Sequence, residues 1–202
     1  MKNYTEKEIC VFNGVMALSK AGKKIYNITV QDIAKAANVG KGTLYEYFPS
    51  KEEILLNTLV YFLGLENQKA QKIAQENISF KDKVYKLYDL ILKSFEDGFA
   101  AVSQFSSSDE MLDIPKLIND SKEYIEQVMT TRNQLIMDIL QSGVDEGVIS
   151  LEFDADYITM AIMANLSCLN YCLHLPTGVS NVCQIEQKKD YAYTILLKSL
   201  NH

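Results

Sequence analysis

Apolar residues recur at intervals of three and four along most of this 202-residue chain, which is the spacing of one face of an α-helix. Residues 29–37 give the first clear example, with an apolar stripe of Val30, Ile33, Ala34 and Ala37. The hydroxyl of Thr29 can cap this helix, and Asp32 completes the pattern of a capping box. The segment therefore predicts a short helix whose start is fixed locally.

The helical pattern stops at Asn38, a residue that tolerates the left-handed backbone conformation. We therefore expect a turn over residues 38–40 and a second short helix over residues 41–48, with Leu44 and Phe48 facing inward. The proline that follows ends this helix. Five side chains point outward or lie at its edge: Lys41, Thr43, Tyr45, Glu46 and Tyr47.

Ser50 and Glu53 form a second capping-box pattern, which predicts a long third helix that starts near residue 51. Lys51 lies in its first turn, where unpaired backbone N–H groups and a cation together suit a phosphate. Helical pairs with exposed lysines are also common in proteins that bind no nucleic acid. The distribution of charge separates these two interpretations.

Residues 1–51 hold eight lysines against four acidic residues, a net charge of +4, while the whole chain carries −6. The remaining residues therefore carry −10. A basic segment on an acidic body favours an oriented encounter with a polyanion, because the segment is attracted and the body is repelled. This asymmetry favours duplex DNA as the partner of the first quarter of the chain.

The segment ITVQDIAKAANVGKGTLYEYFPSKEEIL resembles the N-terminal DNA-binding signature of the TetR family of transcriptional regulators. The resemblance covers about the first quarter of the chain and departs from the family at Asn38, where glycine is frequent. It implies that a set of seven residues contacts DNA: Thr29, Lys41, Gly42, Thr43, Tyr45, Tyr47 and Lys51.

Within this set, the resemblance implies base contacts from Lys41, Thr43 and Tyr47, and phosphate contacts from Thr29, Tyr45 and Lys51. The only arginine in the chain is Arg132, so residues 1–51, which we call the head, lack the bidentate arginine contact to guanine. DNA shape is therefore expected to contribute to specificity. Packing of Tyr45 or Tyr47 between the second and third helices remains an alternative to DNA contact.

The composition predicts an all-α fold, because three prolines and nine glycines interrupt long stretches of good helix formers. We expect a three-helix helix-turn-helix domain over residues 1–50 and a ligand-binding and dimerisation domain over residues 51–202, with about nine helices in total. The body helices are expected at residues 51–77, 81–104, 111–117, 120–144, 157–175 and 185–200. Pro115 is expected to interrupt the short helix over residues 111–117.

Residues 157–175 contain no charged residue and are about long enough to cross a bilayer. Four polar residues interrupt the segment and no lysines cluster beside it, so we predict a helix buried on more than one side instead of a membrane span.

Because one short reading helix touches few bases, a two-fold dimer is expected. The resemblance implies an interface on the last two helices that includes Ala161, Ala164, Cys168, Tyr171, Tyr191 and Ile195, with Tyr193, Leu196 and Leu200 beside them.

The resemblance also implies a small-molecule effector inside the body whose binding is coupled to DNA affinity. Aromatic, methionine and amide side chains of the body could line its pocket: Tyr88, Phe95, Phe99, Phe105, Met111, Tyr124, Met137, Met163 and Asn165. Such a stripe can equally be core. Asn165 is the strongest candidate because an amide within an apolar helix needs a partner, which a second subunit could also supply.

The sequence gives little support to other functions. The N-terminus lacks the apolar run of a signal peptide, which favours a cytoplasmic protein. No cofactor or metal is expected, since Cys168, Cys172 and His174 lack the further ligand that a metal site needs. Two histidines, no phosphate-binding loop and no nucleophile elbow argue against an enzyme.

The sequence therefore predicts a ligand-responsive transcriptional regulator. We expect a repressor that binds a palindromic operator as a homodimer and is released by a small molecule. The alternative is a helical scaffold protein that uses its basic head on an acidic protein or membrane partner. Salt dependence separates the two, because duplex binding falls steeply with salt, with a log–log slope of about −0.9 per phosphate contacted.

Overall fold

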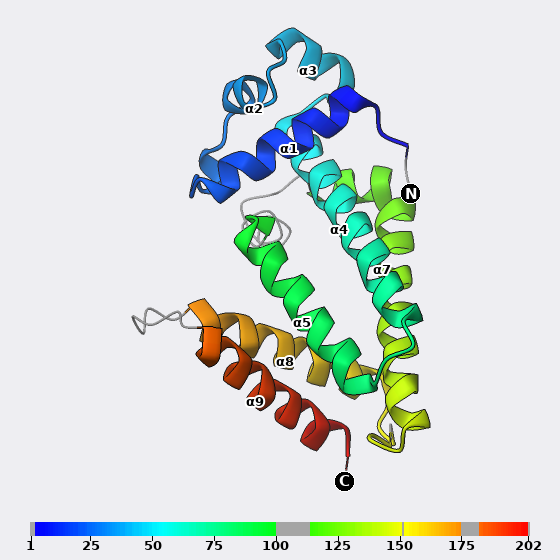
Figure 1. Cartoon of the computed structure of the whole chain (residues 1–202). Coiled ribbons are helices and arrows are strands. Elements are labelled where there is room, and N and C mark those ends of the chain that lie inside the picture. Colours follow the sequence, from blue (N-terminus) through cyan, green and yellow to red (C-terminus); the bar gives the residue numbers. More distant parts are fainter. Residues whose placement is uncertain (1–2, 100–113, 151, 175–181, 202) are drawn as a thin grey trace. The chain divides into compact units, whose positions relative to one another are not determined.

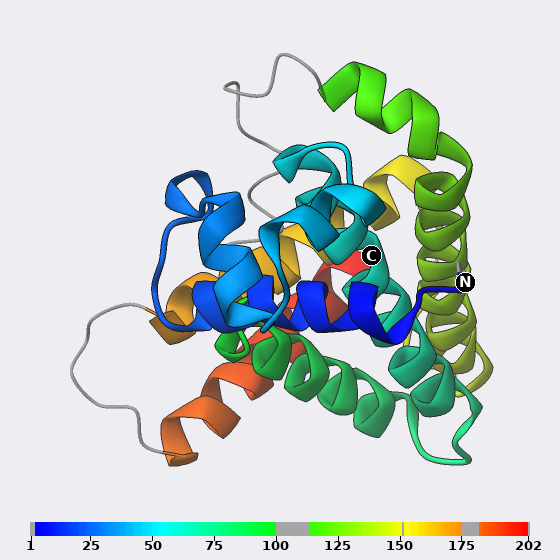
Figure 2. The same cartoon turned by 90° about the horizontal axis from the view of Figure 1, so that it is seen from above.

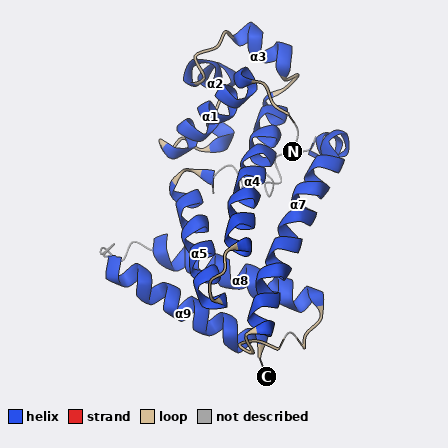
Figure 3. Ribbon diagram, turned by 45° about the vertical axis from the view of Figure 1, so that its right-hand side comes forward, coloured by secondary structure: helices blue, strands red, loops and turns tan. Residues whose placement is uncertain are grey.

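The computed structural model of the chain describes residues 3–99, 114–150, 152–174 and 182–201. Within these ranges all regular structure is helical, as Figure 3 shows, and the all-α prediction is confirmed. The helices in Figure 1 are α1 (Glu6–Lys20), a 3-10 turn (Ile25–Asn27), α2 (Val30–Ala36), α3 (Lys41–Tyr47), α4 (Lys51–Gln75), α5 (Phe80–Glu96), α7 (Ile114–Asp145), α8 (Ala155–His174) and α9 (Val182–Leu200).

Packing divides the chain into two compact units. The first unit contains Met1–Lys69 and Lys93–Asn133, and the second contains Ala70–Leu92 and Gln134–His202. Helix α4 starts in the first unit and continues without a break into the second. The functional boundary expected after residue 50 stays a prediction, because these units are defined by packing alone.

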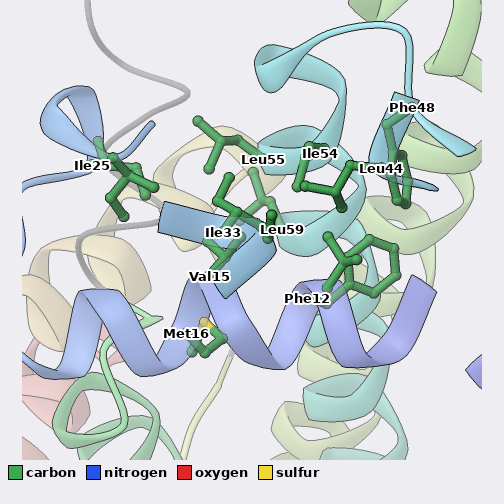
Figure 4. Packing of buried hydrophobic residues seen from close by; sticks show 13 residues of the cluster. Phe12, Val15, Met16, Ile25, Ile33, Leu44, Phe48, Ile54, Leu55 and Leu59 are labelled. Atoms are coloured by element: carbon green, nitrogen blue, oxygen red, sulfur yellow. The ribbon is translucent and has the colours of Figure 1, made fainter. Parts of the chain in front are cut away.

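The core of the first unit is built from α1, α2, α3 and the start of α4 (Figure 4). Ile33, Leu44 and Phe48 are buried in it, as their spacing predicted. Burial of each large apolar side chain contributes about 1.5–3 kcal/mol to folding. The other buried members are Val11, Phe12, Val15, Met16, Ile25, Ile28, Ala34, Ile54, Leu55 and Leu59.

A glycine allows α1 and α2 to cross closely, which Figure 2 shows from above. A Cβ atom added to Gly14 would lie 3.0 Å from the backbone nitrogen of Ala37 and 3.2 Å from its Cβ. The small residue that permits this crossing is therefore on α1. Sequence reasoning did not identify Gly14, because its partner follows it by more than twenty residues.

The end of α1 is fixed by a turn that glycine favours. Gly22 has a φ of +82°, and its N–H donates to the carbonyl of Ser19 at 2.8 Å while the N–H of Lys23 donates to that of Leu18 at 3.1 Å. This pair of hydrogen bonds is the Schellman motif, in which a residue without a side chain best adopts the left-handed conformation.

The second unit has its own core, made of parts of α5, α7, α8 and α9. Phe80 lies fully buried against Gly143, where an added Cβ would come within 2.9 Å of the Phe80 ring. Helices α8 and α9 pack side by side in this unit (Figure 3). The buried members are Phe80, Val84, Tyr88, Ile139, Leu140, Ile149, Ile158, Leu169, Ala192, Tyr193, Leu196 and Leu200.

Some predicted boundaries were wrong. Pro115 does not interrupt a separate short helix, because α7 runs unbroken from Ile114 to Asp145. The proline lies in the first turn, where no intrahelical hydrogen bond needs its missing N–H. Helix α5 ends at Glu96 instead of residue 104, just before Gly98 with its φ of +94°. Asp154 caps α8, since Asp154 Oδ1 accepts from the N–H of Tyr157 at 2.8 Å.

None of the helices in the described ranges combines the length and the apolar character that crossing a bilayer requires.

Candidate nucleic-acid interface

The start of α2 is held by the predicted capping box. The Thr29 hydroxyl donates to Asp32 Oδ2 at 2.6 Å and accepts from the Asp32 N–H at 3.2 Å, while the Thr29 N–H donates to Asp32 Oδ2 at 2.8 Å. Lys23 Nζ lies 2.6 Å from the same carboxylate oxygen. Lys23 first, and then Thr29, hold the pKa of Asp32 well below its ordinary range.

The turn between α2 and α3 is also confirmed. Asn38 has a φ of +54° and is the one non-glycine residue with positive φ in the described chain. Its N–H donates to the carbonyl of Lys35 at 3.2 Å, and the N–H of Val39 donates to that of Ala34 at 2.9 Å. This second Schellman motif ends α2 and redirects the chain into α3.

Helix α3 is anchored by two buried residues, while its first turn is exposed. Leu44 and Phe48 pack in the core of the first unit, and the Phe48 N–H closes the helix on the carbonyl of Leu44 at 2.8 Å. Lys41 and Gly42 are exposed in the first turn. This seven-residue helix is thus held from one side and exposes Lys41, Gly42, Tyr45 and Glu46 to solvent.

Neither packing within the described chain nor backbone conformation requires glycine at position 42. A Cβ atom added there would meet nothing within 4 Å, and the backbone has no positive φ. Glycine costs about 1 kcal/mol relative to alanine in a helix. An external partner that approaches the first turn of α3 closely would account for this residue.

The structure separates the two tyrosines of α3. Tyr45 is 50% exposed and points to solvent. Tyr47 is half-buried and packs against the core, with its ring centroid 6.4 Å from that of Phe48. The packing alternative therefore describes Tyr47, while Tyr45 remains available. Thr43 is half-buried beside the helix start.

Lys51 lies at the start of α4, where Ser50 Oγ accepts from the N–H of Glu53 at 3.1 Å. Lys51 Nζ donates to the carbonyl of Tyr26 at 3.3 Å. Tyr26 is itself exposed, and Lys24 Nζ lies 5.8 Å from its ring centroid. The sequence prediction did not include Lys24 and Tyr26 among the candidate DNA-contacting residues. A lysine close to an aromatic residue in the basic segment was a signal that could have selected them.

In the body, two of the predicted effector-binding residues meet. The Tyr88 hydroxyl donates to Asn165 Oδ1 at 2.7 Å, and Asn165 Nδ2 donates to the carbonyl of Ala192 at 2.7 Å. Both side chains are buried, and burial raises the pKa of Tyr88 above its ordinary value. Asn165 thus finds its partners within one chain, on α5 and α9, without a second subunit.

The other predicted effector-binding residues do not join this pair in the described structure. Phe99 packs at the edge of the first unit's core, and Tyr124 belongs to the same unit. Met137 and Met163 are largely exposed. Phe105, Met111 and the side chain of Phe95 lie outside the described residues.

The predicted dimer face is partly exposed. Met160 and Tyr171 on α8 are 72% and 67% exposed, and Ala164 and Cys168 lie exposed between them. Tyr191 and Ile195 are exposed on α9. Sequence reasoning missed Met160, although it precedes Ala164 by one turn. We call these six residues the α8/α9 face.

Four residues expected at or beside the interface are buried or half-buried within the single chain. Ala161 packs against the core of the second unit, and Tyr193, Leu196 and Leu200 are buried within it. On α9 the helical period places these buried residues away from the exposed Tyr191 and Ile195, whereas Ala161 shares the face of Ala164 and Cys168 on α8. Whether any of these four residues meets a second subunit stays a prediction.

A charged cluster that the sequence did not reveal joins α9 to α5. Lys189 Nζ lies 2.6 Å from Asp89 and 2.8 Å from Glu186, and its side chain is almost fully buried. The Tyr85 hydroxyl donates to Asp190 beside it.

No group of three or more possible metal-ligating side chains occurs among the residues that the structure describes. The side chains of Cys172 and His174 lie outside these residues.

Comparison with known proteins finds similarity to transcriptional regulators. Residues 23–58 match the family model described as bacterial regulatory proteins, tetR family. The chain is 28% identical over 131 residues to the HTH-type transcriptional repressor KstR2 of Mycolicibacterium smegmatis, which covers 64% of this chain and 62% of that protein. The chain thus aligns with about three fifths of this relative's length.

Solved structures match the fold over nearly the whole chain. A putative transcriptional regulator from Saccharomonospora viridis in complex with choline has a TM-score of 0.71 at 17% identity and covers 96% of each chain. FadR from Bacillus subtilis in complex with stearoyl-CoA has a TM-score of 0.66 at 17% identity, over 95% of this chain and 97% of that one. At these identities the likeness concerns the fold.

Proposed function

We propose that this chain, whose residues 23–58 match the model of bacterial regulatory proteins of the tetR family, is a transcriptional regulator that binds a DNA operator through α3. The observation that carries the proposal is the outer face of α3, held by Leu44 and Phe48 from behind. Its first turn contains an unobstructed glycine, beside exposed Lys41. A short helix presented in this way fits the major groove.

The geometry refines the roles proposed for the DNA-contacting set. Lys41 and Thr43 are the proposed base-reading residues, and Tyr45 and Lys51 are proposed to contact phosphates. Thr29 Oγ1 is engaged in the cap of α2, so the proposed phosphate contact at Thr29 would be made by the backbone at the start of α2. Tyr47 packs inward and is proposed to support α3 with only its edge available to DNA.

A homodimer on a palindromic operator is the proposed assembly. The α8/α9 face supports it, because large apolar side chains on one face of a helix pair are more exposed than a monomer requires. A two-fold dimer has two copies of α3, which suits the two half-sites of a palindromic operator.

Control by a small molecule is the third part of the proposal, with repression relieved when the effector binds. The relative KstR2 is named a repressor, and structures of the same fold hold stearoyl-CoA or choline. For this chain the proposed effector-binding residues remain those of the sequence prediction, with Tyr88 and Asn165 the pair that the structure brings together.

Selection of bound duplexes from a random library tests the proposal and yields the operator. With that operator, Lys51→Ala is expected to weaken binding of all duplexes alike, because it removes a phosphate contact, whereas Thr43→Ala is expected to change the ranking among them. Fluorescence anisotropy titrations at several salt concentrations measure both effects.

Two results would argue against this assignment. Equal losses on every sequence for both variants would remove Thr43 from the base-reading set. Binding that lacks sequence preference and a steep salt dependence would favour the scaffold alternative, in which the basic head meets an acidic protein or membrane.

A further inference from the structure

The chain uses lysine at nineteen of its twenty basic positions and arginine once, at residue 132. Arg132 lies on α7 in the first unit, one turn beyond Val128. The carbonyl of Val128 accepts a hydrogen bond from Asn67 Nδ2 of α4 at 2.8 Å, and both of these residues are buried. The arginine therefore stands at the place where α4 and α7 pack together.

The guanidinium of Arg132 has no partner within the described chain. Its side chain is half-buried, yet no carboxylate of the described residues lies within 4.0 Å of it and none of their acceptors forms a hydrogen bond with it. The acid that acts on it electrostatically is Glu66, and that carboxylate already pairs with Lys69 Nζ at 3.1 Å. Burial lowers the pKa of Arg132, and Glu66 opposes this effect.

A half-buried guanidinium loses part of its hydration, which costs stability unless a partner replaces the lost water. A guanidinium presents five N–H donors and cannot lose its proton to relieve the cost of burial. Buried donors in native proteins are almost always paired, and a lysine on a flexible stem would reach solvent more easily. The arginine is therefore better explained by a ligand than by the fold.

We propose that Arg132 binds the anionic group, a carboxylate or a phosphate, of the small-molecule effector at the contact between α4 and α7. A guanidinium fork matches both groups through two parallel hydrogen bonds. Asn67 lies beside it with its amide engaged to the backbone, so it supports the position of α7 without competing for the anion. The inference rests on the proposed ligand control and gives the effector a chemical class.

The test compares four eight-carbon probes that differ in charge: octanoate, octyl phosphate, octan-1-ol and octylammonium. Thermal melting and titration calorimetry of the full chain are measured for the unmodified protein, Arg132→Gln and Arg132→Lys. Octanoate or octyl phosphate is expected to raise the Tm of the unmodified protein, while the alcohol and the amine are not. The anionic shift should vanish in Arg132→Gln and shrink in Arg132→Lys, which keeps the charge but loses the fork.

Lys72→Gln, which removes an exposed cation from α4, is the matched control and should respond as the unmodified protein does. Without probe, Arg132→Gln should melt at or above the Tm of the unmodified protein, because an unpaired charge has been removed. A clearly lower Tm would show that the arginine serves the fold and would overturn the inference. So would the absence of any shift with both anionic probes, or an equal shift in Arg132→Gln.

Failure here is distinguishable from failure of the proposed function. Binding of the selected operator by the unmodified, probe-free protein tests α3 independently of any anionic probe. Operator binding without an anionic response rejects only the role of Arg132, whereas loss of operator binding in the unmodified protein rejects the regulator itself.

Discussion

At the scale of single residues, two glycines of the head differ in what surrounds them. Gly14 is required from inside, because the backbone of Ala37 leaves no room for a side chain. Gly42 faces open space, so the reason for it lies outside the folded chain. The same residue type thus marks a packing contact on α1 and a candidate DNA contact on α3.

Gly42→Ala is expected to stabilise the head or leave it unchanged, by up to about 1 kcal/mol, since alanine favours the helix. It should weaken operator binding by obstructing the close approach of DNA. Gly14→Ala provides the contrast, with a lower Tm and little change in the affinity of the folded fraction. Melting curves and anisotropy titrations of both variants check this, and unchanged affinity for Gly42→Ala would contradict it.

At the scale of elements, Asp32 ties the start of α2 to Lys23 at the end of α1. Because the folded pKa of Asp32 is depressed, its contribution to stability is present above the unfolded pKa of about 4 and is lost as pH falls toward the lower folded value. Asp32→Asn should therefore make α2 less protected at neutral pH and flatten its response to acid.

Hydrogen exchange of the α2 amides between about pH 6 and pH 3, corrected for intrinsic rates, measures this effect. Glu46→Gln, a change of an exposed acid on α3, is the control and should keep the original acid response. An identical response in Asp32→Asn would show that the cap contributes nothing to the stability of α2.

Asn165 joins three helices, since it accepts from Tyr88 on α5 and donates to α9. Asn165→Ala leaves both partners buried without a hydrogen bond and should destabilise the second unit by at least about 2 kcal/mol; Tyr88→Phe should cost about 1–3 kcal/mol. Urea unfolding of both single variants and the double variant tests the coupling. Strictly additive costs would contradict a shared hydrogen bond.

At the scale of the whole molecule, the head explains recognition only if two copies act together. Tyr171→Glu or Ile195→Glu places a charge on the α8/α9 face, where each side chain is already exposed, so the fold should persist. The variants are expected to sediment as monomers and to lose affinity for a palindrome. Thr130→Glu on α7 is the control, and a dimer that survives both face variants would reject this interface.

Much of the head could be predicted from the sequence, because its determinants are local. The bonds that start α2 join residues three apart, and the turn at Asn38 depends on one residue's tolerance of positive φ. The inward stripes of α2 and α3 follow from the helical period. The pocket residues were harder to predict, since a buried aromatic side chain has the same pattern whether it meets a ligand or a neighbouring helix.

The sequence by itself determined the all-α fold, the helix starts and the basic head, since each depends on interactions within about four residues or on composition. Only the tertiary structure decided which side of α8 and α9 is core, that Tyr47 packs inward, and that Arg132 finds no partner among the residues that the structure describes. Asn67 meets Val128 across 61 positions and Tyr88 meets Asn165 across 77. Contacts between positions so far apart arise from how whole helices pack, which local spacing does not encode.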